Sequence, residues 1–140
     1  MYILYGVRMI SITYVILGVL GFLPLNAINP LHHEGVGARY LLNLVAINSV
    51  HNLIHLAIGL TGLWAVQRLA LAQLWGKVIG ITLLVIFVVG MVQAAAEGYP
   101  IDQILLGLVV LNSPGHTLHL ATGLIALYLG LARSPDRAAV

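Results

Sequence analysis

The chain has no cysteine and very few charged residues. The absence of cysteine excludes disulfides, thiolate chemistry and covalent haem attachment through a C-x-x-C-H motif. Charged residues make up only 7% of the 140 positions, whereas a soluble domain has about a quarter. Hydrophobic residues make up 61%, and the mean hydropathy is +1.04, which indicates an integral membrane protein. The net charge of +2 is too small to indicate nucleic-acid binding.

The apolar stretches suffice for four membrane spans and no soluble domain. We therefore predict an all-α four-helix membrane bundle that forms a single domain over residues 1–140, with spans near 6–23, 48–66, 78–92 and 113–131. Residues 40–66 are longer than one span needs. Either they form one tilted helix, or residues 40–47 lie at the interface and a helix begins after Asn48. Residues 104–111 pose the same alternative, and Asn112-Ser113-Pro114 favours a break because proline suits the first helical turn.

The basic residues are unevenly distributed between the two sides of this four-span arrangement. One side has Arg8, Arg68, Lys77, Arg133 and Arg137, and the other has only Arg39 together with Glu34, Glu97 and Asp102. Because cytoplasmic loops carry an excess of lysine and arginine, we expect both termini in the cytoplasm.

The chain has an internal repeat. Residues 40–63 and 104–127 are identical at 12 of 24 positions at a fixed offset of 64, including Asn48/Asn112, His55/His119 and Gly59/Gly123. The first and third spans also align, at offset 69. We predict two tandem helical hairpins, over about 6–66 and 75–131, related by a pseudo-two-fold axis along the membrane normal. This symmetry would put His55 and His119 at the same depth.

Four histidines lie in these apolar segments: His51 and His55 in the first repeat, His116 and His119 in the second. Their spacing puts each pair on one helical face. One interpretation is a structural polar clasp, in which the histidines bond across helices with Asn48, Asn52, Asn112, Ser49 and Ser113. The other is a ligand set for haem, a chlorophyll-type pigment or a transition metal. We favour the clasp, with the ligand set as the alternative.

A polar loop in the first half contains His32, His33 and Glu34. These side chains are a candidate surface metal site, but adjacent residues rarely converge on one ion, so we interpret them as an exposed loop. No acid–base pair, nucleotide motif or catalytic triad accompanies the buried histidines. We therefore expect a protein that is not an enzyme.

The segment Asn48-x-x-His51-Asn52-Leu53-x-His55-Leu56-x-x-Gly59 resembles the first signature of a bacterial four-span membrane family. That family is catalogued as domain of unknown function 4383. Its second signature, Asn-x-x-Asp-Asn-x-x-His-Leu, is matched at Asn112, His119 and Leu120, while Gly115 and His116 replace the Asp-Asn pair. The resemblance implies the four-helix fold and a bacterial inner membrane but no activity. We expect an accessory or assembly subunit that packs in the lipid bilayer with other membrane subunits or with itself.

Overall fold

The computed structural model describes residues 1–23, 37–97 and 103–133. This part of the chain is helical apart from two short β-hairpins. Its elements, in chain order, are α1 (Tyr2–Phe22), β1 (Arg39–Leu41), β2 (Val45–Ile47), α2 (Ser49–Ala65), α3 (Leu69–Glu97), β3 (Gln103–Leu105), β4 (Val109–Leu111) and α4 (Ser113–Leu131).

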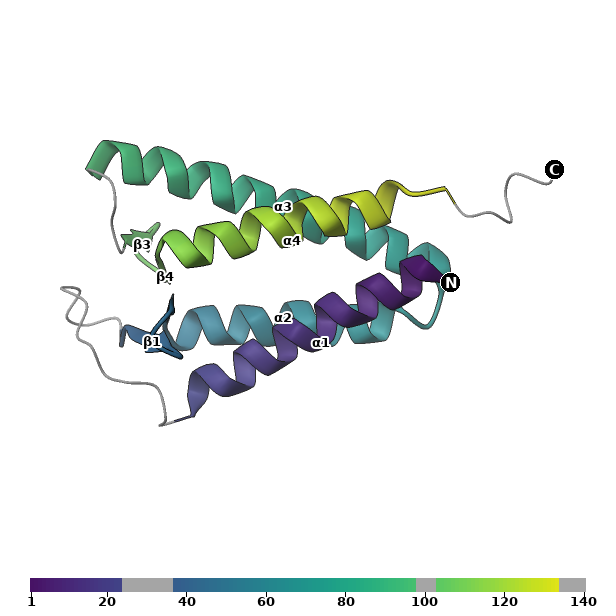
Figure 1. Ribbon diagram of the computed structural model, residues 1–140, viewed down its shortest axis with the longest axis horizontal. Coiled ribbons are helices and arrows are strands. Elements are labelled where there is room, and N and C mark those ends of the chain that lie inside the picture. The colour runs from purple at the N-terminus through teal and green to yellow at the C-terminus, as the bar shows by residue number, and fades with distance from the viewer. Residues whose placement is uncertain (24–36, 98–102, 134–140) are drawn as a thin grey trace.

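The helices form two antiparallel pairs. Figure 1 shows α1 lying along α2 and α3 lying along α4, and the two pairs are stacked against each other. Both hairpins lie at one end of the molecule. The start of α1, the α2–α3 junction and the end of α4 lie at the other end. By length and composition, α1 and α3 are the two described helices that are apolar enough to cross a membrane.

The helices α2 and α4 begin at equivalent residues for the same physical reason. The side chain of Asn48 accepts a hydrogen bond from the His51 amide at 2.9 Å, and that of Asn112 accepts one from the Gly115 amide at 3.1 Å. Each asparagine thus satisfies an amide that the first helical turn leaves without a partner. Residues 40–47 and 104–111 are therefore separate from the helices, and the alternative of one long tilted helix is wrong.

The all-α prediction is confirmed for the four helices, and the two segments before α2 and α4 add two-stranded antiparallel hairpins that we did not predict. Their turns need left-handed backbone at Leu42 (φ 52°) and Asn43 (φ 56°), and again at Leu106 (φ 50°) and Gly107 (φ 73°). Two successive residues with positive φ match the twist of paired strands. The apolar composition of both segments hides this turn from a reading of hydropathy alone.

Glycines bring the helices of each pair into close contact. A Cβ added at Gly59 would lie 2.6 Å from Val15 Cγ2, and one added at Gly18 would lie 2.7 Å from Leu56 Cγ. Gly21 packs directly against the side chain of Asn52. Gly18 and Gly21 thus form a small-residue contact between α1 and α2.

The third helix is longer than predicted. It spans residues 69–97, so most of the expected loop at 67–76 is helical, as are residues 93–97 of the expected following loop. Trp75, near the start of this helix, is only 7% exposed, and its Nε1 donates to Thr61 Oγ1 at 3.1 Å. Trp64, by contrast, is 61% exposed. Apolar composition could not separate an interfacial tryptophan from one that packs between helices.

Candidate functional site

Three of the predicted histidines form a cluster in the interior. His51 and His55 project from α2, and His119 projects from α4. Their ring centroids are 4.3 Å apart for His51 and His55, 5.7 Å for His51 and His119, and 6.3 Å for His55 and His119. One ring nitrogen from each of the three lies within 4.8 Å of the others.

The cluster is almost completely removed from solvent, and most of its polar atoms have no partner. The exposed fractions are 2% for His51, 1% for His55 and 4% for His119. Within the described residues, no hydrogen bond reaches His51 Nε2, either nitrogen of His55, or His119 Nδ1. Buried polar atoms are normally paired, and each one left unpaired costs about 1–3 kcal/mol. An interior site with four such atoms needs a physical reason.

One contact fixes the tautomer of His51. Its Nδ1 lies 3.0 Å from the carbonyl oxygen of Val110 in β4. A carbonyl only accepts, so Nδ1 carries the proton and Nε2 keeps a free lone pair. Histidines that bind metals are typically oriented in this way, by donating their other ring N–H to a carbonyl or carboxylate.

The aromatic ring of Tyr14 forms one wall of the cluster. It meets the His55 ring edge to face with centroids 5.1 Å apart, and its hydroxyl lies 2.8 Å from Thr122 Oγ1 on α4. Tyr14 is fully buried and comes from the first helix. Sequence reasoning missed it, because a single tyrosine in an apolar span carries no periodic signal that separates it from the other core residues.

His116 is not part of the cluster, although it lies on the same helix as His119. Its Nε2 is 2.8 Å from the side-chain nitrogen of Gln103, which also donates to the Gly90 carbonyl at 3.0 Å. Gln103 is fully buried and was not singled out from the sequence. At the offset of 64, His116 corresponds to Asn52 in the first half of the chain.

Asn48 and Asn112 form reciprocal contacts between the halves of the chain. Asn48 donates to the Leu108 carbonyl at 2.8 Å, and Asn112 donates to the Leu44 carbonyl at 2.9 Å. The two donor residues are 64 positions apart in the sequence, and so are the two acceptor residues. The Oδ1 of Asn112 also accepts from the Ala46 amide at 3.2 Å. These two asparagines thus bond to the hairpins rather than to histidine side chains.

The other predicted members of the clasp take different places. The expected bond between His55 and Asn112 is absent, since neither nitrogen of His55 has a partner among the described residues. Asn52 is buried against Gly21, and its Oδ1 also has no partner in that part of the chain. Ser49 is exposed at the start of α2, and Ser113 is half-buried at the start of α4. The candidate loop site at His32, His33 and Glu34 lies outside the described residues.

The geometry discriminates between the ligands considered above. Imidazole nitrogens suit zinc, copper, iron and nickel ions. A porphyrin or chlorophyll bound between His55 and His119 would need a flat space midway between their rings. His51 lies closer to each of those rings than they lie to each other, so its imidazole stands in that space. The residues fit a single metal ion and do not fit a macrocycle between His55 and His119.

The comparisons with known proteins identify one family. A family model described as Domain of unknown function (DUF4383) matches residues 5–132. Searches of curated proteins and of solved structures found no match.

Proposed function

The chain belongs to the domain of unknown function 4383 family, and we propose that it is a four-span membrane protein that binds one transition-metal ion through His51, His55 and His119. Two observations carry this proposal: one ring nitrogen from each of the three buried histidines converges on a common point, and four ring nitrogens of the cluster have no partner among the described residues. A structural clasp would leave no such set, because its purpose is to pair these atoms.

Metal binding would need only small movements of the three rings. Three nitrogens at about 2.0 Å from one ion lie about 3.5 Å from one another, whereas here they lie within 4.8 Å. A contraction of about an ångström through side-chain rotation completes the site. The bond from His51 to Val110 holds one ligand in the required tautomer throughout.

The charge of the site favours copper(I). All three ligands are neutral, and no carboxylate belongs to this group of ligands in the described chain. A bound ion therefore keeps its full charge in a medium of low dielectric constant. The Born cost of burying an ion rises with the square of its charge, so a divalent ion costs about four times as much as a monovalent one. Copper(I) also accepts imidazole ligands and low coordination numbers.

We further propose that all four helices cross the bilayer as two tandem hairpins. The reciprocal contacts of Asn48 and Asn112 support an internal repeat, since both donor and acceptor shift by the same 64 positions. The start of α1, the α2–α3 junction and the end of α4 lie at the same end of the molecule. The first and last helices therefore begin and end on one side, which supports an even number of spans. With Arg8, Arg68 and Lys77 toward that end, the termini face the cytoplasm of a bacterium.

In this proposal the protein is an accessory subunit rather than an enzyme. Within the described residues no carboxylate joins the three histidines, which supports holding or handing over an ion rather than chemistry on a substrate. The site lies near the hairpin end, because His55 is six residues into α2, or about 9 Å from its start. The ion would therefore enter from the side opposite the termini.

The test is metal stoichiometry in purified protein. We would load the protein in mild detergent with copper(I) under a reducing agent, desalt it and measure copper by mass spectrometry. We expect one ion per chain in the wild type and background levels in His55→Ala and His119→Ala. His116→Asn is the matched control, since it alters a buried histidine of the same helix outside the cluster, and it should retain the ion.

Two results would contradict the proposal. One is a wild type that holds no copper and no zinc after loading. The other is equal loss of metal in the His116→Asn and His55→Ala variants, because that would trace the loss to general disruption of the fold. Circular dichroism on every variant separates an unfolded protein from a folded one without its site.

A further inference from the structure

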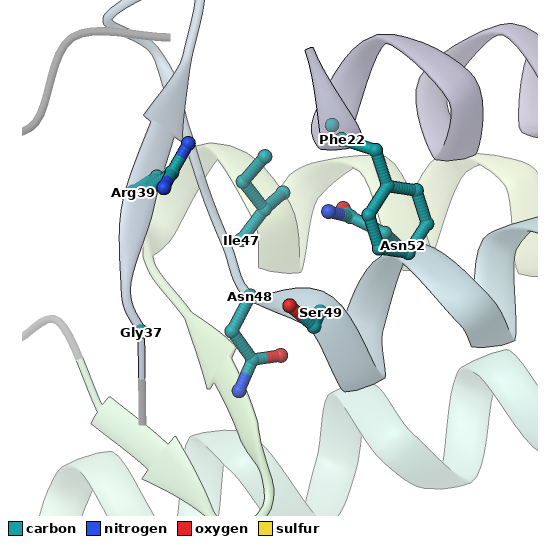
Figure 2. A pocket seen from close by; sticks show the side chains of 8 residues that line it. Phe22, Gly37, Arg39, Ile47, Asn48, Ser49 and Asn52 are labelled. Carbon is teal, nitrogen blue, oxygen red and sulfur yellow. The ribbon is translucent and has the colours of Figure 1, made fainter. Parts of the chain in front are cut away.

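A second polar site lies at the hairpin end of the first helix pair, away from the histidine cluster. It is an open pocket of about 180 Å³ between the end of α1, β1 and the start of α2. This is several times the ~30 Å³ that one water molecule occupies in the liquid. The residues that line it are Gly21, Phe22, Gly37, Arg39, Ile47, Asn48, Ser49 and Asn52. Figure 2 labels all of them except Gly21.

The pocket has a positive electrostatic character. Among the described residues that line it, Arg39 alone carries a charge. The pocket also adjoins the N-terminus of α2, a helix of 17 residues whose dipole places partial positive charge there. Asn48 Oδ1 caps the amide of His51, whereas the amides before it have no partner within the helix. The first of these amides belongs to Ser49, which lines the pocket.

A buried polar group in the pocket has no partner. Asn52 is 2% exposed, and its Oδ1 receives no hydrogen bond from the described residues. Figure 2 shows its amide projecting from α2 into the space between Ile47 and Phe22. The oxygen can only accept, so a ligand that satisfies it must supply a donor such as a hydroxyl.

The second half of the chain shows what a closed version of this site looks like. Gln103 and His116 stand at the positions of Arg39 and Asn52, at the offset of 64. There the glutamine is fully buried and bonds both to His116 and to the Gly90 carbonyl. The second half thus fills its own site with side chains, whereas the first half keeps a cationic side chain at the rim and an unpaired amide oxygen inside.

We propose that this pocket binds a phosphate group that carries a hydroxyl. The Arg39 guanidinium and the free amides of α2 would bind the anionic oxygens, since arginine pairs with phosphate through parallel N–H donors. The hydroxyl would donate to Asn52 Oδ1. Two sources offer this chemistry: inorganic hydrogen phosphate, and the headgroup of phosphatidylglycerol, which joins a phosphodiester to hydroxyls. The pocket is at the end of the helices, where lipid headgroups would lie.

The experiment compares three probes on the full chain in detergent, by isothermal titration calorimetry in phosphate-free buffer. The probes are inorganic phosphate, dihexanoyl-phosphatidylglycerol and dihexanoyl-phosphatidylcholine, whose headgroup has a phosphate but no hydroxyl. We expect binding of at least one of the first two, and binding of phosphatidylcholine at least tenfold weaker. Tight binding of inorganic phosphate alone identifies a soluble ligand, and binding of phosphatidylglycerol alone identifies a lipid.

Variants link any binding to the pocket. Arg39→Gln should weaken binding by tenfold or more. Arg133→Gln, which removes an exposed arginine at the opposite end of the helices, should leave it unchanged. Asn52→Ala should remove the preference for phosphatidylglycerol over phosphatidylcholine, while circular dichroism reports whether each variant is folded. The proposal is overturned if neither phosphate nor phosphatidylglycerol binds, if phosphatidylcholine binds equally well, or if a folded Arg39→Gln variant binds like the wild type.

Discussion

Replacing Asn112 should separate two contributions of one side chain to stability. Its Oδ1 caps α4 through Gly115 and accepts from the Ala46 amide, and its Nδ2 donates to the Leu44 carbonyl. A cap contributes about 1 kcal/mol, and each buried hydrogen bond contributes about 1 kcal/mol. Asn112→Ala should therefore lower the free energy of unfolding by about 3 kcal/mol, or about 2 kcal/mol if the two bonds between halves have the ~0.6 kcal/mol average of membrane proteins.

Asn112→Ser isolates the bonds between the halves. Serine caps a helix about as well as asparagine, but its shorter side chain cannot also reach the hairpin around Leu44 and Ala46. We expect it to lose about 1–2 kcal/mol, with the remaining ~1 kcal/mol of the alanine variant coming from the cap. Asn48→Ala, which removes a cap and a single bond to Leu108, should cost about 2 kcal/mol.

The assay is reversible unfolding in mild detergent, followed by circular dichroism against a denaturing detergent. Ser49→Ala is the control, because Ser49 is exposed next to Asn48 in the first turn of α2, and it should change stability by less than ~0.5 kcal/mol. If Asn112→Ala behaved like this control, the contacts between the halves would contribute nothing, and our account of how the two hairpins are held together would be refuted.

Other positions yield further predictions. Gly59→Ala should destabilise the protein by about 1–3 kcal/mol, because the added Cβ would lie 2.6 Å from Val15 Cγ2 and 2.7 Å from the Ser11 carbonyl. In Gly115→Ala the added Cβ would meet only ordinary contacts, at 3.4 Å or more. An unfolding titration should find this variant as stable as the wild type or up to ~1 kcal/mol more stable. Equal losses of stability in the two glycine variants would contradict the helix contacts described. Because the chain has no cysteine, single cysteines at Leu106 and Arg68 report topology. An impermeant maleimide should label Leu106→Cys in intact spheroplasts and Arg68→Cys only after lysis, and the reverse pattern would invert the proposed orientation.

Much of the fold could be predicted because long apolar helices leave a strong signal in the sequence. The apolar stretches located α1, α2 and α4 to within a few residues, and the asparagine caps set the starts of α2 and α4 correctly. The ends of α3 were missed, since hydropathy marks lipid contact rather than helix length. The hairpins were missed because leucine occupies the first left-handed position of each turn, where asparagine or glycine is usual, and only the second position has Asn43 or Gly107.

Three of the four histidines that the sequence singled out lie together, but the bonds around them could not be predicted. Helical spacing identified the histidines, and the repeat related His55 to His119, whose ring centroids are 6.3 Å apart. His116 lies outside the cluster and bonds to Gln103 instead. Gln103 is buried because it belongs to a hairpin that we did not predict from the sequence. The free lone pair of His51 likewise depends on a carbonyl of β4, 59 positions away. Contacts of this kind carry no local pattern in a single sequence.

The most direct test of the central claim is X-ray absorption spectroscopy of the copper(I)-loaded protein. The account predicts three nitrogen ligands at about 2.0 Å with the outer-shell scattering of imidazole rings, and a loss of that signal in the folded His55→Ala variant. A spectrum dominated by oxygen or methionine sulfur, or one that His55→Ala leaves unchanged, would show that the three buried imidazoles do not hold the ion.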